Sequence, residues 1–150
     1  MKIGISACLL GDKVRYDQTD KRNDTIIELL KGHEVIKICP EVSSGFSLPH
    51  EPLEIKDDKV YTKSGIDVTE QLYKGSRKCF DQIKDCDFVI LKAKSPSCGY
   101  GLIYDGSFKG ILIKGNGVFT GLCLENGIEV FNELQIEEIR KRLSQTDSDR

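Results

Sequence analysis

The alternation of short apolar segments with helical ones is the feature that most constrains the fold of this chain. The segments with the length and residue types of buried strands are Lys2–Ser6, Glu34–Ile38, Phe88–Lys92 and Ile128–Asn132, with Gly110–Lys114 as a weaker fifth. The helical stretches between and after them are Thr25–Lys31, Asp67–Asp85, Val118–Glu125 and Gln135–Leu143. This order predicts an α/β fold: a single three-layer domain with a mostly parallel, Rossmann-like sheet and helices on both faces.

The predicted domain spans residues 1–143, and the sequence SQTDSDR at 144–150 is expected to be a polar, frayed C-terminal tail. Asn23 or Asp24 suits the N-cap of the first helix. Asp67, with Glu70 three residues later, has the spacing of a capping box at the start of the long helix.

One connection, from Pro40 to Ile66, is long for an α/β fold. Within it, LEIKDDKVYT alternates about the Asp57-Asp58 pair as a small β-hairpin does. Because the connection begins directly after Cys39, it is either a lid over whatever Cys39 binds or a surface hairpin without a role. The sequence favours neither alternative.

Charge and hydropathy exclude two classes of partner. The 22 basic and 24 acidic side chains nearly balance, so there is no electrostatic case for binding a nucleic-acid duplex. No apolar run approaches the ~20 residues that cross a bilayer, and the apolar stretch at the start is too short for a signal peptide. We therefore expect a cytoplasmic protein without a membrane partner. In that compartment six cysteines indicate metal binding or catalysis rather than disulfides.

Three of the six cysteines have the pattern of core residues. Cys79 and Cys86 continue an apolar stripe that begins at Val68 in the long predicted helix. Cys123 lies between two leucines in the next helix. These three thiols are expected to be small buried hydrophobic side chains.

The other three cysteines follow predicted strands. Cys8 comes two residues after the first strand, Cys39 directly after the second, and Cys98 lies in the SPSCG turn beyond the strand at Phe88–Lys92. The carboxyl ends of parallel strands share one edge of a sheet, where ligands bind. We therefore expect the three thiols to meet at one site. The alternative is that three cysteines fell in turns by chance.

Soft thiolate ligands select zinc, copper(I) or an iron–sulfur cluster. Neither His33 nor His50 has the spacing of a metal ligand, and both are interpreted as surface residues. A structural zinc site takes four protein ligands, one more than this set supplies. A [4Fe–4S] cluster on three cysteines leaves one iron open for a Lewis-acid role. From the residues alone, both the cluster and zinc remain open.

Polar residues near these turns are candidates for further roles. Glu41, two residues past Cys39, could activate a water, although a solvated loop glutamate is equally consistent with the spacing. Ser95 and Ser97 could bind a substrate or cap their turn. Arg15 and Tyr16 could grip a phosphate and stack on a base, or lie in solvent. The segment KGNGVFTG offers a weak anion seat at a helix N-terminus, or an ordinary turn.

Several motifs together resemble a bacterial family, formerly of unknown function, whose characterised members are [4Fe–4S]-dependent thiouracil desulfidases. The motifs are ISACLLGDKVRYD, CPEVSSG, GIDVTEQ, LKAKSPSCGYGLIYDGSFKG and GNGVFTGLCLENGIEVFNE, and the likeness runs over about residues 1–133. The resemblance implies a cluster on Cys8, Cys39 and Cys98, with Glu41 and Ser95 as catalytic residues. One departure is EVSSGFSLPHEP, where relatives tend to have a GGLPTPR-like stretch, so the preferred substrate of this chain could differ.

We therefore expect a non-redox desulfidase acting on a thiolated nucleobase or nucleotide. The open iron of the cluster would polarise the thiocarbonyl, Glu41 would activate water, and Ser95 would relay a proton. Ser97, Arg15 and Tyr16 would contact the substrate, and the products would be the carbonyl compound and hydrosulfide. The alternatives are a zinc-dependent hydrolase or deaminase on the same three cysteines, and a non-catalytic carrier of sulfide or metal.

Overall fold

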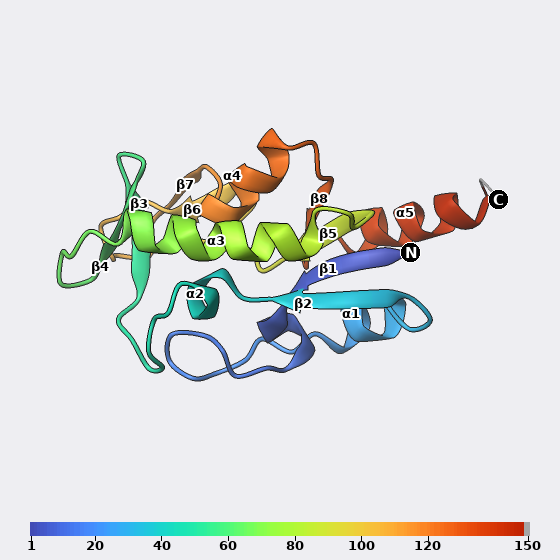
Figure 1. The fold of residues 1–150 in the computed structure, drawn as a ribbon, viewed down its shortest axis with the longest axis horizontal. Helices are drawn as coiled ribbons and strands as arrows, with labels where there is room; N and C mark the ends of the chain where they lie inside the picture. Colours follow the sequence, from blue (N-terminus) through green and yellow to red (C-terminus); the bar gives the residue numbers. More distant parts are fainter. Residues whose placement is uncertain (149–150) are drawn as a thin grey trace.

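The chain folds around a four-stranded parallel sheet with the strand order β2-β1-β5-β8 (Figure 1). The structure is a computed structural model and describes residues 1–148. The strands of the sheet are β1 (Lys2–Ser6), β2 (Glu34–Ile38), β5 (Phe88–Leu91) and β8 (Val130–Asn132). Each of them lies within a segment predicted from the apolar pattern. The predicted α/β architecture with a parallel sheet is confirmed.

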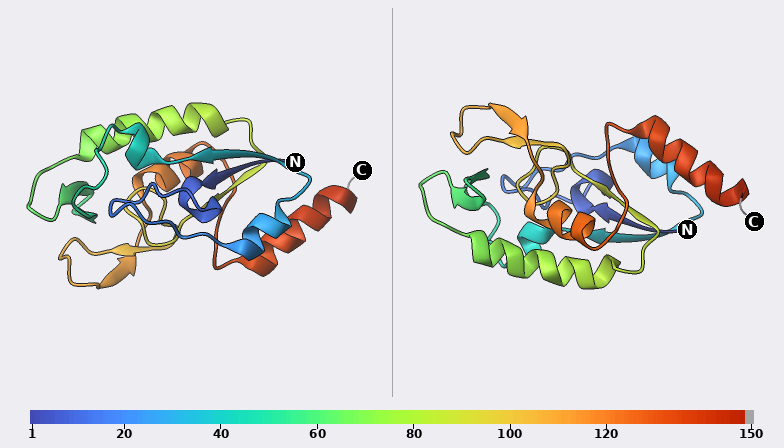
Figure 2. Two further views of the ribbon diagram at one scale, coloured as in Figure 1. Left: turned by 90° about the horizontal axis from the view of Figure 1, so that it is seen from below. Right: turned by 90° about the horizontal axis from the view of Figure 1, so that it is seen from above.

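Helices cover both faces of this sheet (Figure 2). They are α1 (Asp24–Leu29), α2 (Pro40–Ser43), α3 (Thr69–Ile83), α4 (Val118–Glu125) and α5 (Ile136–Ser148), and a short 3-10 turn, η1 (Ala7–Leu10), follows β1. The helices α1 and α5 cover one face, and α3 and α4 cover the other. No helix among residues 1–148 combines the length and the apolar character needed to cross a bilayer.

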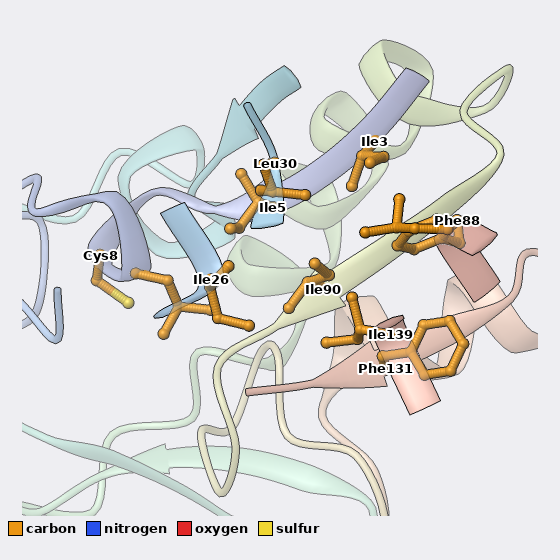
Figure 3. Packing of buried hydrophobic residues seen from close by; sticks show 11 residues of the cluster. Ile3, Ile5, Cys8, Ile26, Leu30, Phe88, Ile90, Phe131 and Ile139 are labelled. Carbon is orange, nitrogen blue, oxygen red and sulfur yellow. The ribbon is translucent and has the colours of Figure 1, made fainter. Parts of the chain in front are cut away.

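Strand β5 shows how the sequence produces this layering. Its side chains alternate, so that Phe88 and Ile90 enter the cluster covered by α1 and α5 (Figure 3). Val89 and Leu91 enter the cluster covered by α3 and α4. All four side chains have no exposed surface. A strand buried on both faces needs such a continuous apolar run, and that run is the signal from which it was predicted.

The three cysteines predicted to be core residues do lie in the core. Cys79, Cys86 and Cys123 are all buried in the cluster between the sheet and the helices α3 and α4. Burial raises the pKa of the Cys123 thiol to about 12, so this thiol is neutral at physiological pH.

Two β-hairpins lie beyond the carboxyl ends of the sheet strands (Figure 2). They are formed by β3 (Leu53–Lys56) with β4 (Lys59–Thr62), and by β6 (Leu102–Tyr104) with β7 (Leu112–Lys114). In the first, Asp57 and Asp58 both have positive φ angles, of 52° and 64°, as a two-residue hairpin turn requires. The weak fifth strand predicted at Gly110–Lys114 is β7. It pairs with β6 and not with the central sheet.

Two predicted helix boundaries are wrong. The capping box at Asp67 does not form, because Asp67 still pairs with Tyr61 in extended conformation and α3 begins only at Thr69. At the other end of the chain, α5 continues to Ser148, past the predicted boundary at Leu143. Leu143 is buried, and the polar sequence after it extends a helix that has already formed. Residues 149–150 of the predicted tail lie outside the described residues.

Candidate functional site

A cavity of about 520 Å³ lies at the carboxyl ends of the strands. Its walls include all eight residues that the sequence indicated for the site, namely Cys8, Arg15, Tyr16, Cys39, Glu41, Ser95, Ser97 and Cys98. Both hairpins contribute to the walls, β3 through Leu53 and Glu54 and the β6–β7 hairpin through Tyr104 and Phe108. Of the two alternatives for the long connection after Cys39, the structure therefore favours a cavity wall over a surface hairpin without a role.

Three neighbouring strands carry the three cysteines to this cavity. Cys8 lies in η1 directly after β1, Cys39 is the N-cap of α2 directly after β2, and Cys98 follows β5. Because β2, β1 and β5 are adjacent in the sheet, their ends bring the thiols to one edge. Within residues 1–148, no three Cys, His, Asp or Glu side chains are grouped closely enough to hold a metal ion.

The surroundings keep these thiols protonated when no metal is bound. Burial raises the pKa of Cys8 to about 11 and that of Cys39 to about 12. Burial also raises the pKa of Cys98 well above its ordinary value, although hydrogen bonds from Ser6 and Ser97 oppose the shift. A metal that binds here must therefore displace the thiol protons.

The SPSCG turn is shaped by a hydrogen bond that its own first serine accepts. The backbone N–H of Cys98 donates to Ser95 Oγ at 2.6 Å, and the N–H of Gly99 donates to the Ser95 carbonyl at 2.9 Å. Ser95 Oγ also lies 3.2 Å from Ser97 Oγ. Ser95 thus fixes the backbone that presents the Cys98 thiol.

The N-terminus of α4 also holds the SPSCG turn, through backbone hydrogen bonds. The N–H groups of Phe119 and Thr120 donate to the carbonyl of Ser97 at 2.9 and 3.2 Å. Of the two alternatives for KGNGVFTG, the structure favours the ordinary turn over the anion seat, because carbonyl oxygens of the SPSCG turn already occupy these donors. Gly117 permits the approach, since a Cβ at this position would lie 2.5 Å from the carbonyl carbon of Ser97.

Glu41 lies on α2 with its carboxylate in the cavity wall and 17% of its side chain exposed. Oε2 accepts a hydrogen bond from Ser97 Oγ at 3.1 Å, and Oε1 lies 3.5 Å from His50 Nε2. Burial raises the pKa of the Glu41 carboxyl, while the charge of His50, the Ser97 hydrogen bond and Arg15 act in the opposite direction. The carboxyl is thus more basic than an exposed one, as a general base requires.

Close packing of α2 against α3 fixes the position of Glu41 and of Cys39 before it. Gly75 of α3 faces the backbone of α2, and a Cβ there would lie 2.6 Å from the Pro40 carbonyl oxygen. Ser44 donates its hydroxyl to the same carbonyl at 2.6 Å. Only glycine at position 75 leaves room for this contact.

Arg15 and Tyr16 form another part of the wall, in the loop after η1. The guanidinium carbon of Arg15 lies 5.7 Å from the centre of the Tyr16 ring. Nη1 of Arg15 donates to Thr19 Oγ1 at 3.3 Å. The two side chains therefore offer a cation and an aromatic ring to the cavity.

The interpretation of His50 as a surface residue is wrong. Its side chain is 9% exposed and faces Glu41, because its backbone N–H donates to the carbonyl of Tyr16 at 2.8 Å and draws the segment over the site. No sequence spacing indicates this contact between two loops. His33 is half-buried, with Nδ1 3.1 Å from the N-terminal amine.

Sequence reasoning also missed a partly buried ion pair close to Cys8. Lys92 Nζ lies 3.0 Å from Glu133 Oε2 and donates to the carbonyl of Ala93 at 2.9 Å. The Lys92 side chain lines the cavity, and its charge opposes the upward shift of the Cys8 pKa. A signal was present in the sequence, since the two charged residues directly follow the adjacent strands β5 and β8.

Comparisons with known proteins agree with this arrangement. The chain is 37% identical over 147 residues to the uncharacterized protein YbbK of Bacillus subtilis (strain 168), covering 90% of this chain and 97% of YbbK. Its structure is similar to that of the [4Fe–4S]-dependent thiouracil desulfidase TudS, with a TM-score of 0.89 and 38% identity over 96% of this chain and 98% of TudS. A sequence model of the 2-thiouracil desulfurase family matches residues 3–135. The chain belongs to the 2-thiouracil desulfurase family.

Proposed function

We propose that this protein removes sulfur from a thiolated pyrimidine, a nucleobase or nucleotide, by hydrolysis and without net electron transfer. Water supplies the oxygen of the carbonyl product, and the sulfur leaves as hydrosulfide with one proton released. The observation that carries the proposal is the convergence of Cys8, Cys39, Cys98 and Glu41 on one cavity. Membership of the desulfurase family and the likeness to TudS support it.

The donor set suits an iron–sulfur cluster held by the three cavity thiols. Thiolates are the ligands such clusters use, and each thiolate binds a different iron. The three thiols line one cavity at the ends of adjacent strands, where they would hold such a cluster. When bound through three cysteines, a [4Fe–4S] cluster supplies an open iron that acts as a Lewis acid toward sulfur.

Glu41 acts in this proposal as the general base. Its buried carboxylate takes a proton from the water that attacks the thiocarbonyl carbon. The proton can pass through Ser97 Oγ, 3.1 Å from Oε2, to Ser95 Oγ, 3.2 Å further on. The two serines therefore connect the base to the turn that carries Cys98.

Arg15 and Tyr16 act as substrate contacts. The Tyr16 ring stacks on the pyrimidine, and the Arg15 guanidinium binds a carbonyl or phosphate oxygen of the substrate. The cavity of about 520 Å³ lies in the size range of small-molecule sites.

The experiment is turnover of 4-thiouracil in ¹⁸O-labelled water by anaerobically reconstituted protein. We expect uracil with ¹⁸O at the former sulfur position, together with one hydrosulfide per uracil. Protein loaded with zinc instead of iron is expected to be inactive. Iron-loaded protein that consumes neither 2-thiouracil, 4-thiouracil nor a thiouridine monophosphate would contradict the proposal.

A further inference from the structure

His50 lies against Glu41 in the wall of the cavity but is not one of the residues assigned above. Its side chain is 91% buried, and its ring centre lies 5.2 Å from that of Phe46 and 6.2 Å from that of Tyr16. Among the described residues, Nε2 is a buried nitrogen with no hydrogen-bond partner in this arrangement, and it lies 3.5 Å from Glu41 Oε1. A buried nitrogen in this position needs a partner at the site.

The other ring nitrogen fixes the orientation of the His50 ring. Nδ1 lies 2.6 Å from the backbone carbonyl oxygen of Glu51, which only accepts hydrogen bonds. Nδ1 therefore carries a hydrogen, and the ring is held with Nε2 toward Glu41. Nε2 is thus the nitrogen that faces Glu41, and an Nε2–H there makes the ring an imidazolium, whose charge complements the carboxylate.

The two carboxylate oxygens of Glu41 thus face side chains from two different loops. Ser97, beyond β5, donates to Oε2, and His50, after α2, faces Oε1. Contacts at both ends define the plane of the carboxylate, whereas a single hydrogen bond leaves it free to rotate. The lone pairs of the carboxylate that remain for the attacking water then point in fixed directions.

We propose that His50 is a positioning residue that orients Glu41 toward the attacking water through an Nε2–H hydrogen bond. This inference rests on the proposed function, in which Glu41 is the base. The contact shortens from 3.5 Å to hydrogen-bonding distance by a small ring or carboxylate movement when the site is filled.

Two variants separate this role from simple packing. His50→Phe keeps the ring against Phe46 and Tyr16 but has no donor, whereas His50→Gln places an amide N–H close to the position of Nε2. In iron-loaded enzyme we expect His50→Phe to lower kcat about tenfold to a hundredfold, the usual cost of losing such a supporting partner. KM and the visible spectrum should change little. His50→Gln should recover most of the loss.

A double-mutant cycle with Glu41→Gln tests whether His50 acts through Glu41. If it does, adding His50→Phe to Glu41→Gln should cause no further loss of kcat, because the carboxylate that His50 orients is already absent. Additive losses would overturn the inference. So would wild-type kcat in the iron-loaded His50→Phe enzyme, or failure of His50→Gln to exceed His50→Phe.

A spectroscopic measurement tests the contact without relying on turnover. The chain has two histidines, so His33→Gln leaves one imidazole for ¹⁵N NMR of the histidine-labelled, anaerobic holoprotein. We expect a protonated Nδ1 and an Nε2 resonance that moves with Glu41→Gln but not with Glu54→Gln, a control carboxylate in the same cavity wall. If the wild-type enzyme is active and Glu41→Gln leaves the Nε2 resonance unchanged, this inference is overturned while the proposed function stands. An inactive wild type would overturn the proposed function.

Discussion

The Ser97 hydroxyl donates a hydrogen bond to Glu41 Oε2 at 3.1 Å and joins the SPSCG turn to helix α2, with 56 positions between the two residues in the chain. Ser97 is 2% exposed, so water cannot replace this donor without rearrangement of the turn. The contact connects the candidate base to the turn that presents the Cys98 thiol. This hydrogen bond therefore links the position of the Glu41 carboxylate to that of the SPSCG turn.

Replacing Ser97 by Ala should lower kcat of the iron-loaded enzyme about tenfold to a hundredfold. A hydrogen bond to a charged group contributes about 1.5–3 kcal/mol, and about 1.4 kcal/mol corresponds to a factor of ten in rate. The iron content should stay at the wild-type level, since Cys98 keeps its own contact with Ser95. Steady-state kinetics with parallel iron analysis make the measurement, and an unchanged kcat would contradict it.

Ser95→Ala is the matched comparison, and it should behave differently. This change removes the acceptor for the Cys98 N–H and loosens the turn itself, so we expect lower iron content together with lower activity. Equal iron content in the Ser97→Ala and Ser95→Ala proteins would contradict this difference between the two serines.

Glu41→Gln should separate the chemistry of the base from its structural contacts. The amide keeps the shape of the side chain but not its basic oxygen, so turnover should fall by ~10²–10⁴, the usual contribution of a positioned general base. Iron content and visible spectrum should be those of the wild type. Loss of iron in step with activity would instead assign Glu41 a supporting role beside Cys39.

Gly117→Ala should displace the SPSCG turn, because the new Cβ would lie 2.5 Å from the carbonyl carbon and oxygen of Ser97. We expect a lower unfolding temperature and reduced iron binding. Gly121→Ala in the same helix is the control, since nothing lies within 4 Å of the new Cβ. Alanine in a helix interior should stabilise the protein by up to about 1 kcal/mol. Equal unfolding temperatures for the two variants would contradict the account.

Glu54→Ala should weaken substrate binding more than chemistry. Glu54 Oε1 accepts hydrogen bonds from the N–H groups of Gly106 and Phe108 at 3.0 and 3.1 Å, and so holds the β6–β7 turn against the cavity. Without these contacts the wall at Phe108 is free to move, and KM should rise several-fold while kcat changes little. Glu54→Gln keeps an accepting oxygen and should resemble the wild type. A rise in KM for both variants would contradict this role.

The parts of the fold that were predicted correctly depend on local patterns. The apolar runs at Lys2–Ser6 and Glu34–Ile38 and the alternation around Asp57-Asp58 each specify their element within a few residues. The meeting of the cysteine turns followed from a topological rule, because parallel strands end at one edge of the sheet.

The features that were missed depend on contacts between distant loops. His50 reaches Glu41 because its backbone bonds to the carbonyl of Tyr16, which no local pattern encodes. The N-terminus of α4 looked available for an anion, but the carbonyl of Ser97 occupies its donors. Both cases concern which chemical group lies next to a given side chain or helix end, and tertiary packing decides this.

Iron content of anaerobically purified Cys98→Ser protein, compared with the wild type, tests the central claim most directly. We expect about four irons per chain in the wild type, as a [4Fe–4S] cluster requires, and loss of most of this iron in the variant, because two thiolates cannot replace three. Cys123→Ser should keep its iron and lose only ~1–3 kcal/mol of stability, from its buried hydroxyl. Full iron loading of the Cys98→Ser protein would contradict the account.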